Sequence, residues 1–244
     1  MVTLSTEEPI AVAVVDAIHM GDVERLKRLL RDNPGLATAK LGGDGGDDRG
    51  MTRSLLHVAT DWPGHFPNRA ATVAALVEAG ADVNARFTGP HTETPLHWAA
   101  SSDDVEALDA LLDAGADIEA PGAVIGGGTP MADATAFGQW NAAQRLVERG
   151  ARTSLWEAAA LGLMDRVEKC FASDPPPSHD GITEAFWSAC HGGQPHAAEY
   201  LLTRGADINW IGYDDLTPLD AAGRSNADAL VTWLRERGAR SART

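Results

Sequence analysis

Several acidic and histidine side chains of this sequence are of the types that carry out acid–base chemistry. The carboxylates singled out are Asp61, Asp133 and Glu157, and His191 is the histidine considered with them. Such a set supplies a general base, a general acid and an orienting group if its surroundings shift the pKa values of its members apart. A mononuclear metal site of His191 with two acids is a weaker interpretation, because no short ligand spacing supports it.

Recognisable catalytic motifs are absent from the sequence. It contains no HExxH, no P-loop, no GxSxG and no Rossmann glycine pattern. We therefore expect no metal and no cofactor. Whether the protein is an enzyme stays open, with the noncatalytic interpretation preferred, and any catalysis would be acid–base chemistry of the hydrolase or lyase type.

Helix pairs that recur along the chain must position these side chains. Gly-Ala pairs follow helical apolar patterns at residues 80, 115, 150, 205 and 238, so the spacings are 35, 35, 55 and 33 residues. The glycine supplies the left-handed end of a helix, as after residues 105–113 and 142–148. The long gap fits a repeat that carries Asp174-Pro175 instead of the pair.

Threonine–proline pairs mark the starts of first helices, at residues 94–95, 129–130 and 217–218. Threonine caps a helix, and proline at the first helical position has no N–H to leave unpaired. Residues 94–99, TPLHWA, resemble the ankyrin signature T-P-L-H-x-A, and GADI at 115–118 and GADIN at 205–209 resemble the ankyrin G-A-D-[VI]-N close.

The resemblance to the ankyrin-repeat family implies an all-α solenoid of helix–turn–helix repeats with projecting β-turn fingers. It covers about residues 10–241 as a single domain, with flexible termini at 1–9 and 242–244. Seven repeats are expected, of which the terminal ones and the fifth are degenerate. Their approximate bounds are 10–42, 52–86, 92–120, 127–153, 154–177, 182–210 and 215–241.

The ankyrin arrangement implied by the resemblance places first helices along a concave groove and second helices on the outer face. His57 and His97 occupy the signature histidine position and are assigned to backbone hydrogen bonds. Trp98, Asp133 and Glu157 are expected directly after that position, each in its own repeat, and residues three further along share the same helix face. The resulting groove residues are Asp61, Trp62, Trp98, Asp133, Phe137, Glu157 and His191.

An acidic recess with aromatic walls suits a cationic group, through carboxylate pairing and cation–π attraction of roughly 0.5–2 kcal/mol per ring. Solvated surface carboxylates are the competing interpretation of Asp133 and Glu157. Trp98 is expected at the centre of the site, either as a ligand wall or covered by an insertion at 63–67. Trp210 and Tyr213 lie on a predicted finger turn and are counted as contact residues.

Two longer segments depart from the repeat pattern. The insertion at 63–67 lengthens the spacing between His57 and His97 to 40 residues, and such insertions often belong to a binding face. The segment 41–51 contains GGDGGDD at 42–48, which suggests a calcium loop but lacks the distal glutamate. A flexible, solvated loop is the preferred interpretation of that tract.

The composition and net charge of the chain exclude several classes of protein. The chain has 244 residues, is 44% hydrophobic and 23% charged, and therefore contains enough apolar side chains to fold. Its net charge of −15 argues against general binding of nucleic acid or of anionic membranes. Two cysteines without CxxC spacing, no basic segment at the N-terminus and no long apolar run predict a cytoplasmic protein.

The sequence favours a noncatalytic scaffold for protein–protein recognition. Its acidic, aromatic-lined groove would bind a basic or apolar segment of a partner protein or peptide, and we expect a monomer. The alternative is an enzyme or small-molecule receptor for a cationic or neutral ligand, using the groove carboxylates and a histidine. A closed pocket with convergent carboxylates would favour the alternative, and an open groove with exposed aromatics would favour the scaffold.

Overall fold

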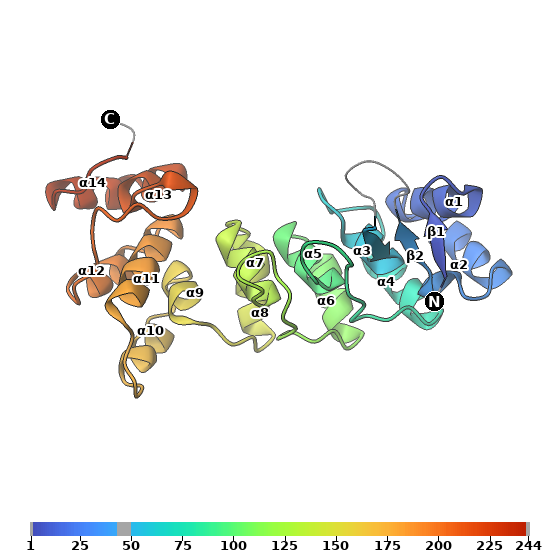
Figure 1. Ribbon diagram of the computed structural model, residues 1–244, viewed down its shortest axis with the longest axis horizontal. Coiled ribbons are helices and arrows are strands. Elements are labelled where there is room, and N and C mark those ends of the chain that lie inside the picture. The colour runs from blue at the N-terminus through green and yellow to red at the C-terminus, as the bar shows by residue number, and fades with distance from the viewer. Residues whose placement is uncertain (1, 43–49, 243–244) are drawn as a thin grey trace. The chain divides into compact units, whose positions relative to one another are not determined.

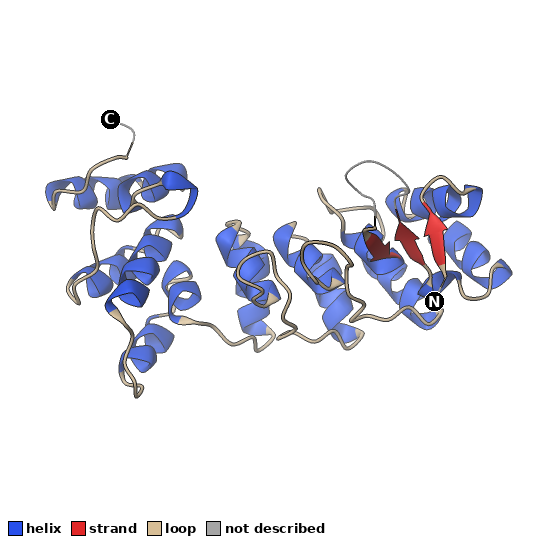
Figure 2. Ribbon diagram, viewed as in Figure 1, coloured by secondary structure: helices blue, strands red, loops and turns tan. Residues whose placement is uncertain are grey.

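The computed structural model describes residues 2–42 and 50–242, which are mostly helical (Figures 1 and 2). The chain divides into two compact units, Met1–Ala151 and Arg152–Thr244. The tract considered as a calcium loop lies outside the described residues, apart from Gly42.

The first compact unit contains four helix pairs that stack in order. First helices pack on first helices, α1 on α3, α3 on α5 and α5 on α7, and second helices pack in the same order from α2 to α8 (Figure 1). This stacking buries the apolar face of each helix against its neighbours. The helices are α1 (Pro9–His19), α2 (Val23–Asp32), α3 (Leu55–Thr60), α4 (Arg69–Glu78), α5 (Pro95–Ser101), α6 (Val105–Asp113), α7 (Pro130–Ala136) and α8 (Trp140–Glu148).

The second compact unit contains three helix pairs around a main apolar core, with a smaller cluster of Trp187, Leu216 and Ala221 beside it. α11 packs between α9 and α13, and α10 packs on α12. Phe186 and Leu201 are fully buried in this core, with Leu234 beside them. The helices are α9 (Leu155–Ala160), α10 (Met164–Phe171), α11 (His179–His191), α12 (Pro195–Leu202), α13 (Pro218–Arg224) and α14 (Asp228–Glu236).

The predicted helix starts and ends are confirmed where the sequence carries both signals. α5, α7 and α13 begin at the proline of a Thr-Pro pair. The glycine of each Gly-Ala pair has a positive φ, for example 98° at Gly80 and 93° at Gly115. A side chain is strained in this left-handed conformation, which is why glycine ends these helices. No helix in the described ranges has the length and apolar character needed to cross a bilayer.

A small sheet at the N-terminal end corrects one expectation. Its strands β1 (Thr3–Ser5), β2 (Lys40–Gly42) and β3 (Thr52–Ser54) lie in the order β1-β2-β3 (Figure 2). β1 is parallel to β2, with Leu4 opposite Leu41, and β3 is antiparallel to β2. Residues 3–5 are therefore not a flexible terminus. Burial of Leu41, which is 1% exposed, and backbone hydrogen bonds hold them.

The insertion of the second repeat spans residues 61–68, between α3 and α4, and is held from both sides. The N–H of His65 donates to Oδ2 of buried Asp104 (2.7 Å), at the start of α6. Phe66 stacks on His19 of α1 with 4.4 Å between ring centroids. Asn68 donates to the carbonyl oxygen of Gly21 (2.9 Å). The insertion therefore braces the first three repeats against one another.

Candidate functional site

In α3 and α5 the signature histidine is the third residue of the helix. It bonds back to the cap of its own helix and forward to the next repeat. In α3, the N–H of Ser54 donates to Nδ1 of His57 (3.3 Å), and Nε2–H of His57 donates to the carbonyl of Glu93 (3.1 Å). In α5, His97 accepts from its cap residue (3.1 Å) and donates to the carbonyl of Gly128 (3.4 Å). Burial lowers the pKa of both histidines to about 4. Their predicted structural role is confirmed.

In the second compact unit, other residue types at the signature histidine position each make one of these two bonds. Trp187, the ninth residue of the longer α11, bonds forward, and Asp220 bonds back to its cap. Nε1–H of Trp187 donates to the carbonyl of Leu216 (2.8 Å), the residue before the cap of α13. Asp220 accepts from the hydroxyl of its cap residue Thr217 (2.8 Å) and from the N–H of Ala242 (2.9 Å). Partial burial works against the charged form of Asp220, but these and further donors hold its pKa at about 2.

Trp98, the expected centre of the site, is half-buried among aromatic rings of its own compact unit. Its ring lies 4.8 Å from that of His57 and 5.5 Å from that of Phe87. Burial raises the pKa of Glu93, and the indole N–H of Trp98 works to lower it against that larger effect. Phe87, from the finger before α5, therefore supplies packing that one of the two interpretations of Trp98 assigns to the insertion at 63–67.

Asp133 is completely buried in α7. Its Oδ1 accepts from the N–H of Ile125 (3.4 Å), and the N–H of Val124 also donates to the carboxylate. Its Oδ2 has no hydrogen-bond partner among the described residues. Burial, reinforced by the negative charge of Glu93, raises the pKa of Asp133 to about 7. Asp133 is therefore not the solvated surface carboxylate of the competing interpretation.

Asp61 and Trp62 lie together at the end of α3. Nη1 of Arg53 donates to Oδ2 of Asp61 (2.9 Å), and the N–H of Trp62 donates to Oδ1 (2.9 Å). Burial raises the pKa of Asp61, and the charge of Arg53 works in the opposite direction. Asp61 is thus already paired, whereas the Trp62 side chain is 79% exposed.

Exposed apolar side chains recur at the ends of first helices in the first compact unit. Met20 caps the end of α1 and is 73% exposed, and Phe137 caps the end of α7 and is 47% exposed. Trp62 follows the cap residue of α3. Because the first helices stack in the order α1, α3, α5, α7, these three side chains follow one edge of the stack. We call Met20, Trp62 and Phe137 the apolar edge.

Glu157 corrects the predicted register of the fifth repeat. It lies at the signature histidine position of α9 and not one residue after it, because this helix starts at Ser154-Leu155 without a proline to mark the register. The N–H and hydroxyl of Ser154 donate to Oε2 of Glu157 (2.6 and 2.8 Å). Glu157 is 7% exposed and belongs to the cap of its own helix.

The structure brings His191, Trp210 and Tyr213 together around Trp187. The ring of Trp187 lies 5.4 Å from His191 and 5.2 Å from Tyr213, and Trp210 lies 6.1 Å from Tyr213. The Tyr213 hydroxyl donates to Glu184. Burial, together with this bond and the charge of Glu184, raises the pKa of Tyr213 to about 12. Of this cluster Tyr213 stays 48% exposed, so it is the member that a ligand would meet.

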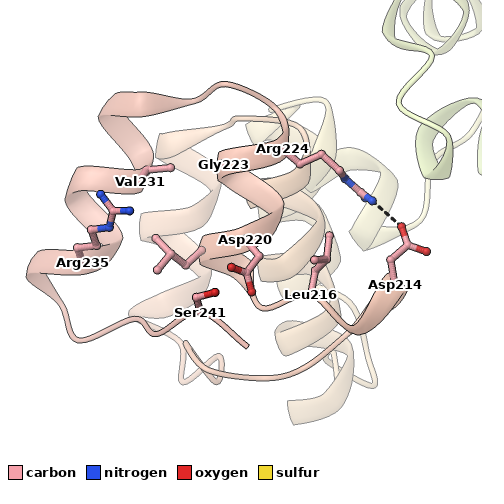
Figure 3. A pocket seen from close by; sticks show the side chains of 9 residues that line it. Asp214, Leu216, Asp220, Gly223, Arg224, Val231, Arg235 and Ser241 are labelled. Atoms are coloured by element: carbon pink, nitrogen blue, oxygen red, sulfur yellow. Dashed lines mark hydrogen bonds and ion pairs between the residues drawn. The ribbon is translucent and has the colours of Figure 1, made fainter. Parts of the chain in front are cut away.

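A recess of about 450 Å³ lies in the last helix pair (Figure 3). Its two acids are engaged, since Arg224 pairs with Asp214 (2.5 Å) and Asp220 accepts the donors described above. No residue predicted for the site lines it. The lining residues are Asp214, Leu216, Leu219, Asp220, Gly223, Arg224, Val231, Arg235 and Ser241.

The predicted site residues therefore fall into separate groups. Asp61, Trp62, Trp98, Asp133 and Phe137 belong to the first compact unit, and the others belong to the second. Among the described residues, no group of three or more His, Cys, Asp or Glu side chains is arranged to hold a metal ion.

Sequence reasoning missed Glu93, whose pKa responds to Trp98 and whose charge acts on Asp133. Glu93 lies in a finger, outside the helix positions from which the groove was predicted. The available signal was an acidic residue directly before the Thr94-Pro95 cap, in a protein that has Asp133 in the following repeat.

Comparison with known proteins identifies similar chains. Residues 68–155 match the family model for ankyrin repeats in three copies. Over 185 residues the chain is 31% identical to the ankyrin repeat and KH domain-containing protein CBG24701 of Caenorhabditis briggsae. That match covers 72% of this chain but only 7% of the relative.

A solved structure supports the fold. The crystal structure of the human ASB11 ankyrin repeat domain superposes with a TM-score of 0.51. The superposition covers 91% of this chain and 96% of that chain, at 21% sequence identity. At this identity the likeness shows a shared fold.

Proposed function

Because the chain belongs to the ankyrin-repeat family, we propose that it is a noncatalytic recognition scaffold that binds a basic or apolar segment of a partner protein. Ankyrin repeats indicate a protein–protein interaction scaffold. The partner segment would lie along the first helices of the first compact unit and contact the apolar edge.

The exposed indole of Trp62 carries this proposal. It is a large apolar side chain, 79% exposed, on an insertion that is braced by Asp104 and His19. Tryptophan is among the residues that most often dominate binding energy at protein interfaces. A rigid support lowers the entropy that a contact residue loses on binding. Trp62 is therefore suited to act as a preformed anchor.

The preference for a basic partner rests on charge. The chain has a net charge of −15, and Asp16 is exposed on α1, the helix that ends at the apolar edge. Asp61 is paired with Arg53, so it contributes less to this preference than its position in the sequence suggested. The apolar edge provides contact area, and the surrounding negative charge selects the sign of the partner.

The alternative function requires Asp133, Glu157 and His191 to act in one reaction. Asp133 belongs to the first compact unit, and Glu157 and His191 belong to the second. The Glu157 carboxylate already accepts two hydrogen bonds in its own helix cap. A carboxylate engaged in this way is less available as a general acid or base, which supports the scaffold over the enzyme.

We further propose that the protein acts as a monomer in the cytoplasm. Both cysteines, Cys170 and Cys190, are free thiols, and burial raises the pKa of the Cys190 thiol. Unpaired thiols are typical of reducing compartments.

Selection of peptides from a random display library on the immobilised full chain tests the proposal. We expect selected peptides to combine Lys or Arg with large apolar side chains. Trp62→Ala should weaken their binding at least tenfold, about 1.4 kcal/mol, because an anchoring indole is lost. Phe137→Ala should weaken it in the same direction. Affinities are measured by fluorescence anisotropy.

Ile211→Ala is the matched control, because Ile211 is 58% exposed and belongs to the second compact unit. It should leave affinity unchanged. Peptides that bind equally well to wild-type, Trp62→Ala and Phe137→Ala proteins would refute the proposed surface, and a selection that yields no binder would refute the recognition of a linear segment.

A further inference from the structure

Asp133 presents an unusual combination of burial and missing contacts. Its side chain has no exposed surface, and Oδ1 is held by backbone N–H groups of the finger between α6 and α7. Oδ2 has no hydrogen-bond partner among the described residues. A buried carboxylate oxygen without a donor costs free energy, so its retention calls for a partner that the folded chain does not supply.

Glu93 adds a second carboxyl group to the same place. It precedes the cap of α5, is 7% exposed, and acts on Asp133 of α7 through its charge. Besides burial, the Trp98 indole N–H and the charge of His91 act on Glu93 itself. α5 and α7 pack directly on each other, so both acids lie at the junction of the third and fourth repeats.

Two neighbouring buried carboxyl groups incur a large electrostatic cost if both are charged and no counter-ion is present. The charged group identified at Asp133 is Glu93, which is negative. In the free protein this repulsion is avoided when Asp133 holds a proton. A bound cation could replace that proton and restore the same net charge.

We propose that Glu93 and Asp133 form a receptor for one cationic side chain of the partner, an ammonium or guanidinium group, which supplies the hydrogen bond that Asp133 Oδ2 lacks. The inference rests on the proposed function, because the cation belongs to the bound partner segment. Glu93, which retains some exposed surface, meets the cation first. The indole N–H of Trp98 favours the charged form of Glu93.

The finger over Asp133 ends in a glycine turn at the surface, which a ligand must displace to reach the carboxylate. Val124 and Ile125 hold the carboxylate through their backbone N–H groups, and Gly126 and Gly127 follow with positive φ values of 60° and 69°. A Cβ built on either glycine meets no atom within 4 Å, so both stand in open space. A ligand that displaces the Val124 and Ile125 contacts, of which the Ile125 bond is 3.4 Å long, reaches Oδ1 as well.

Protons and charge balance in this step. The free pair carries one proton and one negative charge. When a cation binds, the proton leaves Asp133 for solvent, and the pair of carboxylates with the cation again carries one net negative charge. Binding should therefore release close to one proton below neutral pH, and cation affinity should rise with pH until Asp133 is ionised.

The test uses ethylammonium chloride as the probe, with the full chain labelled with carbon-13 in its aspartate carboxyl groups. The Asp133 signal is assigned from its loss in Asp133→Asn. We expect about 50 mM ethylammonium to lower the midpoint of the Asp133 titration by about half a pH unit or more relative to equal NaCl. Guanidinium chloride at the same concentration distinguishes the two cation types. The indole N–H signal of Trp98 should shift in parallel.

Tetramethylammonium is the chemical control, because it has the charge but no N–H donor, and it should act as NaCl does. Asp165→Asn is the control variant, since Asp165 is an exposed aspartate of the second compact unit. Glu93→Gln should remove most of the probe effect while the fold, checked by thermal unfolding, is kept. Equal titration midpoints in ethylammonium, guanidinium and NaCl would overturn the inference. Because the apolar edge plays no part in this test, its failure would leave the proposed function standing.

Discussion

Trp187 holds in the sixth repeat the position that histidine holds in the second and third. Its indole N–H donates to the Leu216 carbonyl (2.8 Å), and its side chain is 4% exposed. An indole can make the forward bond to the next repeat because it also carries a ring N–H donor. What the position requires is a donor of the right reach, and the residue type is secondary.

Trp187→Phe tests the value of that bond. Phenylalanine retains an aromatic ring but has no donor, so the Leu216 carbonyl keeps only the N–H of Gly212 as its partner (2.9 Å). We expect the free energy of unfolding to fall by about 0.5–1.5 kcal/mol, measured by urea unfolding. Trp62→Phe, at a side chain that is 79% exposed, should change it by less than about 0.5 kcal/mol. Equal effects of the two substitutions would contradict the structural role of the bond.

Asp133 predicts a pH dependence of stability with a definite sign. Its pKa is about 7 in the folded protein, above the ordinary aspartate value of 3.8. Between these values the folded state binds the extra proton, so this group's stabilising contribution falls as pH rises through that window, by roughly 1.4 kcal/mol per pH unit at most. Asp133→Asn removes the contribution. The variant should therefore gain stability relative to wild type from about pH 4 to 7.

Urea unfolding of both proteins at several pH values measures this difference in stability. The contributions of other titrating groups are the same in both proteins and cancel on subtraction. His57 and His97 act in the opposite direction, since burial lowers their pKa values from 6.5 to about 4. Their contribution is present above pH 6.5 and is lost as the pH falls to about 4. A wild-type minus variant difference that does not change with pH would show that Asp133 is already ionised across the range.

At the scale of elements, the first residue of a helix could be predicted wherever a Thr-Pro pair precedes the helical pattern. A threonine cap with proline specifies one starting residue, and α5, α7 and α13 begin there. α9 and α11 have no such pair. The register of Glu157 was therefore predicted one residue off, and α11 begins at His179, before the repeat start expected near 182. A helical period alone tolerates such shifts because neighbouring registers bury similar faces.

Positions in fingers and short strands could not be predicted for a different reason. Glu93 meets Asp133 only when two repeats are stacked, and nothing local in the finger reveals that contact. Three-residue strands such as β1 are too short for an alternating pattern to be recognised. Their pairing depends on segments nearly forty residues apart in the chain.

Leu4→Pro tests whether β1 is part of the folded structure. Proline has no N–H and fixes φ, so it disrupts strand pairing. We expect faster hydrogen exchange of the Lys40 amide, which donates to the Val2 carbonyl (3.0 Å), and a loss of roughly 1–3 kcal/mol in unfolding free energy. Leu4→Val, which retains an apolar strand former, should keep the protection. Unchanged exchange in Leu4→Pro would return residues 1–9 to a flexible terminus.

At the scale of the whole molecule, charge and repetition act together. Stacked repeats place equivalent residues at regular intervals. Exposed side chains at the same position of successive repeats therefore line up along one edge of the stack. The apolar edge arises in this way from α1, α3 and α7. The chain also carries 35 acidic against 20 basic residues, an excess that extends beyond any single contact.

That excess predicts salt-dependent association with a basic ligand. A net charge of −15 attracts a cationic peptide at long range, and the range shrinks from about 30 Å at 0.01 M salt to about 8 Å at 0.15 M. Stopped-flow association of a lysine-containing peptide from the display selection should therefore be about tenfold faster or more at the lower salt, with a smaller change in dissociation. The same peptide with glutamine in place of lysine is the control, and its association rate should depend little on salt. An association rate that rises with added salt would mean that apolar contacts alone guide the encounter, and the preference for a basic partner would have to be abandoned while the apolar edge remained.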